Sequence, residues 1–373
     1  MALGLPPERL ATTAMIETTN YPVPDTPHSV SRSIARKLRR LLDGVRRASI
    51  VCHMSPDGDA LGSSLALYRV QTAMGISTRV ITPDMPPRNL MFLPGADNIM
   101  IGSQIPDVVE RTLASAEVIF CLDFNDLHRV DRLAPMIEAS GATRVSVDHH
   151  LDFAMEADLI VSDPSSSSTC ALLYHLLAAS GLEEMIDRDA AICLYTGMMT
   201  DTGNFSYNSN SPDLYLIIAR LLAKGIDKDD IYRKAWNVTS ESRLRLCGYA
   251  LAEKMEIISD CHTAVICLSH EELMRMGYSR GDTESLVNQP LAIPGICCSI
   301  FLREDRPDFV KVSMRSVGDI PVNRFCSDFF GGGGHLNAAG GEFHGSLAQC
   351  RSRLDEIMPL VAECLSNSTT NSL

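Results

Sequence analysis

The sequence predicts an α/β protein: a larger N-terminal domain with a mostly parallel sheet flanked by helices, a helical linker, and a smaller α/β C-terminal domain. Short apolar runs alternate with helical patterns through the first 200 residues, which is typical of a parallel sheet covered on both faces. The pattern changes near residue 258, where strand-like runs follow one another closely. A length of 373 residues suits two domains.

The elements of the first domain are expected in a regular order. The segment 31–48 has apolar residues at helical spacing, and the next apolar run, 48–53, is typical of a short buried strand. Further along, serine or threonine precedes and glycine follows several apolar segments, as at helix ends. The expected strands are 77–84, 116–125 and 143–150, and the expected helices are 56–75, 165–181 and 187–203.

The remaining chain is expected to form a linker and the second domain. Helical patterns continue to residue 257, and strands are expected at 261–269, 295–304 and 308–316, with a helix between the first two. A glycine-rich turn at 330–343 precedes a last helix. The predicted organisation is an arm at 1–30, the first domain at 31–215, the linker at 216–257, the second domain at 258–366 and a polar tail at 367–373.

Composition excludes several classes of protein. The formal net charge of −13 disfavours broad binding to duplex DNA, which depends on neutralising many phosphates. The N-terminus lacks the features of a signal peptide, and no run of about 18 apolar residues predicts a membrane span. The twelve cysteines are scattered, with no CxxC pair, so a zinc site of paired cysteines is not expected. We expect a cytoplasmic protein that does not engage a membrane.

Acidic residues and histidines follow the predicted strands at their carboxyl ends. In a parallel sheet, ligands bind outside these ends, so the clusters are expected to converge. Each has a structural explanation of its own, such as a turn that caps a helix or a solvated loop aspartate. One metal centre explains them together better than several separate coincidences. The residues are His53, Asp57, Asp59, Asp123, Asp148, His149, His150 and Asp201.

These side chains are too many for a single ion. Carboxylates combined with imidazoles favour manganese, iron or zinc over calcium. Two divalent ions about 3.5–4 Å apart with a bridging carboxylate are typical of phosphoester hydrolysis, in which they activate a water. A nearby imidazole can then stabilise or protonate the leaving oxygen.

Five motifs in this order resemble the DHH phosphoesterase superfamily, and the chain resembles its NrnA-like branch over about residues 35–350. That branch degrades short oligoribonucleotides and dephosphorylates 3′-phosphoadenosine 5′-phosphate, and its second domain is a DHH-associated domain. The motifs are HMSPDGDALGS (53–63), CLDFND (121–126), VDHH (147–150), TGMMTDTGNF (196–205) and GGGGHLNAAGG (331–341).

The resemblance implies a role for each matching residue. One metal ion is expected at His53, Asp57 and Asp123. The second is expected at Asp59, Asp123, His149 and Asp201, with Asp123 bridging the two ions. Asp148 is expected to orient a histidine, and His150 to face the scissile phosphate or its leaving oxygen. The family implies two divalent ions, with Mn²⁺ as the expected metal.

The resemblance also implies that the second domain binds the rest of the substrate. Glycine backbones allow close approach to a phosphate, and arginine suits bidentate contact with one. Arg303 and Arg324 are expected to be surface charges. The implied substrate-binding residues are Arg315, Ser316, Gly332, Gly333, Gly334, His335 and Asn337.

The expected activity is a manganese-dependent exoribonuclease acting on RNAs of about two to five nucleotides, with phosphatase activity on a nucleoside bisphosphate. A substrate held by two domains is limited by the length of its cleft, which favours short single strands. The enzymatic alternative is hydrolysis of a cyclic dinucleotide or its linear product. Two other functions are less expected. An inorganic pyrophosphatase would lack the GGGGH motif, which this chain has. A non-catalytic nucleotide sensor would lack a metal-ligand residue, whereas every expected ligand position is filled in this chain. A homodimer is plausible from the family.

Overall fold

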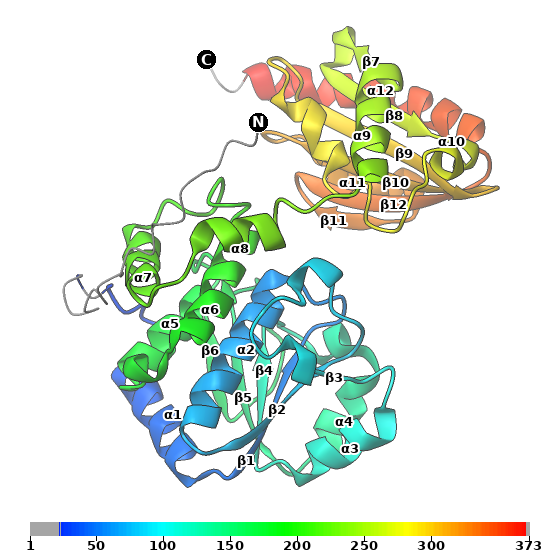
Figure 1. Cartoon of the computed structure of the whole chain (residues 1–373). Helices are drawn as coiled ribbons and strands as arrows, with labels where there is room; N and C mark the ends of the chain where they lie inside the picture. Colours follow the sequence, from blue (N-terminus) through cyan, green and yellow to red (C-terminus); the bar gives the residue numbers. More distant parts are fainter. Residues whose placement is uncertain (1–21, 23, 371–373) are drawn as a thin grey trace, which may run out of the picture. The chain divides into compact units, whose positions relative to one another are not determined.

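The computed structural model describes residue 22 and residues 24–370. It divides the chain into two compact units, with the boundary between Val238 and Thr239 (Figure 1). The boundary lies inside the segment 216–257, which was expected to be a linker. The helices before Val238 therefore belong to the first unit, and the helix that follows Thr239 belongs to the second.

The first unit contains a six-stranded sheet in the order β3-β2-β1-β4-β5-β6. All neighbouring strands run parallel, as the sequence predicts. The first strand, β1, is buried except at its first residue, and β4 is buried throughout. The strands are β1 (Arg47–Cys52), β2 (Ser77–Thr82), β3 (Met100–Ile101), β4 (Val118–Leu122), β5 (Thr143–Asp148) and β6 (Leu159–Ser162).

Helices cover this sheet and enclose two apolar clusters. Several begin at a residue whose side chain accepts a backbone N–H: Ser31 before α1, Asp57 before α2 and Ser168 before α5. The α-helices are α1 (Arg32–Gly44), α2 (Gly58–Ala73), α3 (Pro106–Ser115), α4 (Ala134–Ala139), α5 (Thr169–Ala179), α6 (Arg188–Asp201), α7 (Pro212–Ala223) and α8 (Lys228–Ala235). Short 3₁₀ helices are η2 (Arg88–Leu90), η3 (Ala96–Asn98), η4 (Leu127–Leu133) and η5 (Glu183–Met185).

Helices α2 and α6 approach each other closely because glycines face the contact. A Cβ atom on Gly62 would lie 2.5 Å from the carbonyl oxygen of Cys193. A Cβ atom on Gly197 would lie 2.2 Å from the sulfur of Cys170 and 2.8 Å from a carboxylate oxygen of Asp59. Larger residues would push the helices apart.

The strand order indicates where a ligand binds at the carboxyl edge of the sheet. The chain builds β2 and β3 on one side of β1, and β4, β5 and β6 on the other. The reversal of direction lies between β1 and β4, and ligands of such sheets bind outside the carboxyl ends of the strands at this point.

The second unit has a six-stranded sheet in the order β11-β12-β10-β9-β8-β7. The pair β8 and β9 is parallel and the other pairs are antiparallel. The strands are β7 (Met255–Ile258), β8 (Thr263–Leu268), β9 (Cys298–Arg306), β10 (Phe309–Ser316), β11 (Gly333–His335) and β12 (Ala338–His344). The helices are α9 (Glu241–Glu253), α10 (His270–Arg275), α11 (Val322–Phe330) and α12 (Leu347–Thr370), with 3₁₀ helices η6 (Ser259–Cys261) and η7 (Leu286–Ala292).

The structure differs from the expected boundaries at both ends of the chain. Part of the expected loose arm is attached to the first unit: Val30 is buried, and the Ser29 hydroxyl donates to Asp163 over 2.7 Å. Residues 1–21 and 23 lie outside the described residues. Helix α12 extends to Thr370, so the first part of the expected polar tail is helical.

The glycine-rich segment 330–343 is not a simple turn. It contains the last residue of α11 and the hairpin of β11 and β12.

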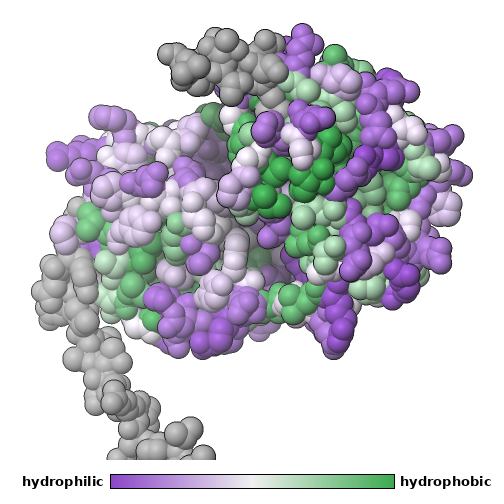
Figure 2. Space-filling view, turned by 90° about the horizontal axis from the view of Figure 1, so that it is seen from above, coloured by the Kyte–Doolittle hydropathy of each residue, from purple (hydrophilic) through white to green (hydrophobic). Residues whose placement is uncertain are grey.

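Among the described residues, no helix is both long and apolar enough to cross a membrane. On the face seen in Figure 2, hydrophobic residues (green) lie in patches between hydrophilic ones (purple).

Candidate metal centre

Acidic residues and histidines converge at the carboxyl edge of the first sheet. They come from the ends of three strands and from two helices that pack on the sheet. His53 follows β1, Asp123 follows β4, and Asp148, His149 and His150 lie at the end of β5; Asp57 caps α2, Asp59 lies in its first turn, and Asp201 is the last residue of α6.

One group of three ligand atoms is formed by His53, Asp57 and Asp123. His53 Nε2 lies 3.5 Å from Asp123 Oδ2 and 3.8 Å from Asp57 Oδ1. The side chains of His53 and Asp123 are almost completely buried, whereas that of Asp57 is 58% exposed. The Asp57 carboxylate also accepts the backbone N–H groups of Asp59 and Ala60, so it caps α2 and faces the cluster at the same time.

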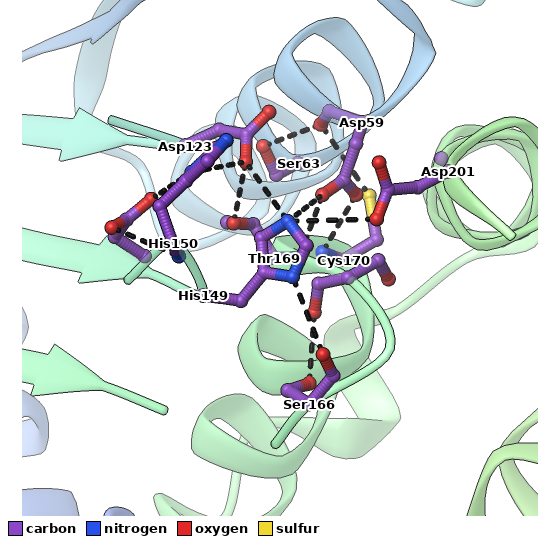
Figure 3. A network of polar contacts seen from close by, with 12 residues as sticks. Asp59, Ser63, Asp123, His149, His150, Ser166, Thr169, Cys170 and Asp201 are labelled. Atoms are coloured by element: carbon purple, nitrogen blue, oxygen red, sulfur yellow. Dashed lines mark hydrogen bonds and ion pairs between the residues drawn. The ribbon is translucent and has the colours of Figure 1, made fainter. Parts of the chain in front are cut away.

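A second group is formed by Asp59, His149 and Asp201. Figure 3 shows the His149 ring between the carboxylates of Asp59, Asp123 and Asp201. Its Nε2 lies 3.5 Å from Asp201 Oδ2, 3.8 Å from Asp123 Oδ1 and 3.9 Å from Asp59 Oδ2. Asp123 therefore presents one carboxylate oxygen to each group.

The spacing of these atoms fits divalent cations. Separations of 3.5–3.9 Å between ring nitrogens and carboxylate oxygens are too long for direct hydrogen bonds. Two ligand atoms that are each about 2.1 Å from an ion, at about 110° to one another, lie roughly 3.4 Å apart. The oxygen and imidazole ligands suit divalent transition ions.

The charges of the cluster also fit cations. Burial and the negative charges of Asp123 and Asp201 raise the pKa of Asp59 well above its usual range. Burial and the charges of Asp123 and Asp57 raise the pKa of Asp201 to about 6, against the opposing effect of His149. Crowded carboxylates of this kind are stabilised in their ionised form by bound cations.

The histidines of the cluster favour the ionised form of Asp123. Burial raises the pKa of its carboxyl, but the neighbouring imidazoles of His53, His149 and His150 outweigh burial and lower the pKa to about 2. Its backbone has φ of +66°, a left-handed conformation that is rare outside glycine. Such conformations concentrate at functional sites, where surrounding structure maintains them.

The two histidines of these groups are oriented by backbone carbonyls. His53 Nδ1 lies 2.8 Å from the carbonyl oxygen of Met54, and His149 Nδ1 lies 3.3 Å from that of Ser166. A carbonyl can only accept, so each Nδ1 carries the proton. The lone pair of each Nε2 is therefore directed to the cluster, as in other histidine ligands of metals.

His150 is arranged differently. Its Nδ1 lies 2.7 Å from Asp148 Oδ1, and the Asp148 carboxylate also accepts the backbone N–H of His150. Asp148 is completely buried, whereas the His150 side chain is 31% exposed. The hydrogen bond that His150 donates to Asp148 raises the pKa of His150, against the effect of burial. His150 is thus held by Asp148 while part of its side chain stays exposed.

Sequence reasoning missed residues at the start of α5 that support the acids. The backbone N–H groups of Thr169 and Cys170 donate to the two carboxylate oxygens of Asp59, over 2.6 and 2.9 Å. The Thr169 hydroxyl donates to Asp123 Oδ1 over 2.8 Å (Figure 3). The serine-rich run before Thr169 indicates a helix start, but no side-chain pattern predicts that these N–H groups face Asp59.

The predicted substrate residues of the second unit are not all free to bind a ligand. The Ser316 hydroxyl donates to the carbonyl oxygen of Ile320, and the Asn337 side chain donates to the Ser316 hydroxyl and to the carbonyl oxygen of Gly318. These bonds join the end of β10 to the β11–β12 hairpin. The Arg315 guanidinium donates to the carbonyl oxygen of Met314 over 2.8 Å, and His335 is exposed.

The glycines of the same motif have packing roles. A Cβ atom on Gly332 would lie 1.9 Å from the carbonyl oxygen of Gly340, so no larger residue fits there. Gly334 has φ of +144°, which favours glycine. Gly332, Gly333 and Gly334 are exposed to solvent, so their backbones remain accessible from one side.

Two family models match the chain. Residues 47–198 match the DHH family, N-terminal domain, and residues 263–367 match the DHHA1 domain. A curated relative from Thermus thermophilus, named bifunctional oligoribonuclease and PAP phosphatase NrnA, is 30% identical over 82% of this chain and 87% of its own length.

Other relatives extend the comparison. A cyclic-di-AMP phosphodiesterase, PdeA, from Listeria monocytogenes is 25% identical over 83% of this chain and 46% of its own length. The solved structure of an exopolyphosphatase-related protein from Bacteroides fragilis matches 90% of this chain and 99% of that chain, with 41% identity and a TM-score of 0.84. The chain therefore belongs to the DHH family, with an N-terminal DHH domain followed by a DHHA1 domain.

Proposed function

We propose that this protein is a metal-dependent phosphoesterase that degrades short oligoribonucleotides to mononucleotides and dephosphorylates 3′-phosphoadenosine 5′-phosphate. The observation that carries the proposal is that Asp123 presents one carboxylate oxygen to His53 and the other to His149, and so links the two groups of ligand residues. A shared carboxylate between two groups of ligands is the arrangement used for phosphoester hydrolysis. The activity in the name of the Thermus relative supports the substrate class.

In this proposal, His53, Asp57 and Asp123 hold one divalent ion, and Asp59, Asp123, His149 and Asp201 hold the other. When bound, such ions polarise phosphate oxygens and lower the pKa of water. We propose Mn²⁺, because mixed carboxylate and imidazole ligands suit it better than calcium. Thr169 and the carbonyls of Met54 and Ser166 keep the ligand side chains in place.

His150 and Asp148 act on the substrate side of the centre. The hydrogen bond at Nδ1 leaves Nε2 of His150 available to a phosphate oxygen or to the leaving oxygen. Asp148 favours the protonated form of His150, which can donate a hydrogen bond or a proton there. In the second unit, Arg315 and the exposed backbone at Gly332–Gly334 contact substrate phosphate.

A second candidate is hydrolysis of a cyclic dinucleotide or its linear product, which the similarity to PdeA favours. The same two groups of ligands would serve that reaction, so the geometry of the first unit does not separate the two substrates. The match covers 87% of the length of the NrnA relative and 46% of the length of PdeA, which supports the first candidate.

Product analysis tests the proposal. The purified protein would be given Mn²⁺ and end-labelled RNAs of two, three, five and 24 nucleotides, together with cyclic di-AMP and 3′-phosphoadenosine 5′-phosphate. Asp123→Asn removes the shared charge, and Asp43→Asn removes an exposed charge on α1 as a matched control. We expect mononucleotides from the short RNAs with the wild type and the control, and none with Asp123→Asn. Hydrolysis of the cyclic dinucleotide alone would favour the second candidate instead.

A further inference from the structure

A polar pocket in the first unit lies next to the segment that supports His149. Its volume is about 190 Å³, and its walls come from residues 25–27, the segment 163–167, helix α5 and the start of helix α7. None of its lining residues belongs to either group of metal ligands. The function proposed above therefore gives this pocket no role.

The pocket carries negative charge. The carboxylates of Asp25, Asp163 and Asp213 line it, and its described lining residues include no lysine or arginine. Burial raises the pKa of Asp163, but hydrogen bonds from Ser165 and Ser29 outweigh burial and lower the pKa, so this carboxyl is ionised at neutral pH. A pocket with this charge attracts a cation.

Two buried polar side chains of the pocket have no partner. His175 is 8% exposed and Ser167 is 7% exposed, and within the described residues neither the imidazole nitrogens of His175 nor the Ser167 hydroxyl make a hydrogen bond. Buried polar groups are normally hydrogen-bonded, so both groups are available to a bound molecule. Burial lowers the pKa of His175, against the charges of Asp213 and Asp163. The neutral ring therefore offers a lone pair to an N–H donor.

The size and walls of the pocket favour an organic cation over a bare metal ion. A space of about 10–15 Å³ already holds one water, and this pocket is many times larger. Within the described residues, the groups of atoms close enough to hold a metal ion do not include Asp163, His175 or Asp213. The apolar part of the wall suits methylene groups, and it consists of Ala171, Leu214 and Ile217.

We propose that this pocket binds a short aliphatic amine in its protonated form, whose ammonium N–H groups donate to Asp163, Asp213 and His175. Hydrogen bonds between an ammonium group and carboxylates are among the stronger ones in proteins. This inference goes beyond the function proposed above and does not depend on it.

A bound amine has a structural consequence at the segment 163–168. Residues of this segment line the pocket, the Ser166 carbonyl accepts the hydrogen bond of His149 Nδ1, and the Ser168 hydroxyl caps α5. The amine therefore holds the segment that orients His149, and backbone hydrogen exchange there should slow when the amine is bound.

Calorimetric titration of the full chain with 1,4-diaminobutane at pH 7 tests the proposal. Saturating Mn²⁺ would be present, so that the carboxylates of the metal centre do not compete for the amine. We expect one saturable site per chain, and Asp213→Asn and His175→Leu should each weaken binding by roughly five- to tenfold. Asp107→Asn is the matched control, because Asp107 also follows a proline in the first turn of a helix, and it should bind as the wild type does.

A second set of measurements separates recognition of the amine from effects on folding. Asp213→Glu keeps the charge and should retain most of the affinity, and circular dichroism would show that each variant is folded. Hydrogen exchange of peptides that cover residues 163–171 should slow when the diamine is added to the wild type.

Several results would overturn the proposal. Absence of saturable binding at millimolar diamine, or equal affinity in the wild type, Asp213→Asn and His175→Leu, would mean that the pocket does not bind the amine. Equal affinity for 1,4-butanediol, an uncharged chain of the same length, would show that the charge is not recognised. Anomalous diffraction that placed a manganese ion against His175 would assign the pocket to a metal instead.

Discussion

Replacing Thr169 with valine tests how the first unit holds its shared carboxylate. The Thr169 hydroxyl donates to Asp123 Oδ1 over 2.8 Å, and both side chains are almost completely buried. Valine keeps the shape and the backbone N–H that binds Asp59, so only the hydroxyl bond is lost. A hydrogen bond to a buried charged group contributes about 1.5–3 kcal/mol.

This free energy sets the expected effect. At about 1.4 kcal/mol for each factor of ten, Thr169→Val should weaken metal binding or lower kcat/KM by roughly ten- to 100-fold. Residues that orient metal ligands show losses of about this size. The assays are calorimetric titration of the metal-free protein with Mn²⁺ and kcat/KM on a dinucleotide at saturating metal.

Two further variants separate this effect from a general loss of stability. Thr169→Ser keeps the hydroxyl and should restore most of the metal affinity. Thr263→Val removes another buried threonine hydroxyl, which donates to the carbonyl of Cys261 in the second unit, and should leave metal affinity unchanged. Metal affinity and kcat/KM within twofold of wild type for Thr169→Val would refute the reasoning.

Three other predictions concern packing, pH and metal removal. Gly197→Ala places a Cβ atom 2.2 Å from Cys170 Sγ, so it should lower the free energy of unfolding by about 1–3 kcal/mol and remove most activity. Gly248→Ala has open space around its Cβ and should stabilise α9 by up to about 1 kcal/mol. Urea unfolding and kcat/KM would be measured for both variants. Burial raises the pKa of Glu272, but Lys254, Ser269 and Tyr249 outweigh it and lower the pKa to about 2. This ionised glutamate therefore stabilises the second unit above its unfolded pKa of about 4.3, and the stabilisation is lost as pH falls toward 2. Glu272→Gln should lower the stability of the second unit by about 2 kcal/mol at pH 7 and by about half of that at pH 3. Hydrogen exchange of peptides from β8 measures this stability, and equal losses at both pH values would contradict the prediction. Chelation with EDTA should abolish hydrolysis, and Mn²⁺ should restore it better than Ca²⁺.

The sequence predicted those parts of the structure that have a side-chain pattern. Strand β4 is a continuous apolar run, β1 ends in one, and β5 alternates apolar with polar residues. The acids and histidines that follow these strands are visible as motifs. Because parallel strands end at the same edge, convergence of His53, Asp123 and His149 follows from the strand order alone. Strand β3 has only two residues and β6 only four, too few to show a pattern.

Other features depend on backbone groups or on glycine and could not be predicted. The hairpin of β11 and β12 is formed largely by glycine and alanine, which carry no alternating pattern. The N–H groups of Thr169 and Cys170 bind Asp59 from a helix more than 100 residues away. Arg303 lines a pocket formed by β9, β10 and the segment 278–287, and its side chain is only 17% exposed, which corrects the expectation of a surface charge.

The most direct test of the two-metal centre is anomalous diffraction from crystals grown with Mn²⁺, recorded on both sides of the manganese absorption edge. We predict two peaks about 3.5–4 Å apart, one against His53, Asp57 and Asp123 and the other against Asp59, His149 and Asp201, with Asp123 contacting both. A single peak, or two peaks that do not share Asp123, would contradict the account.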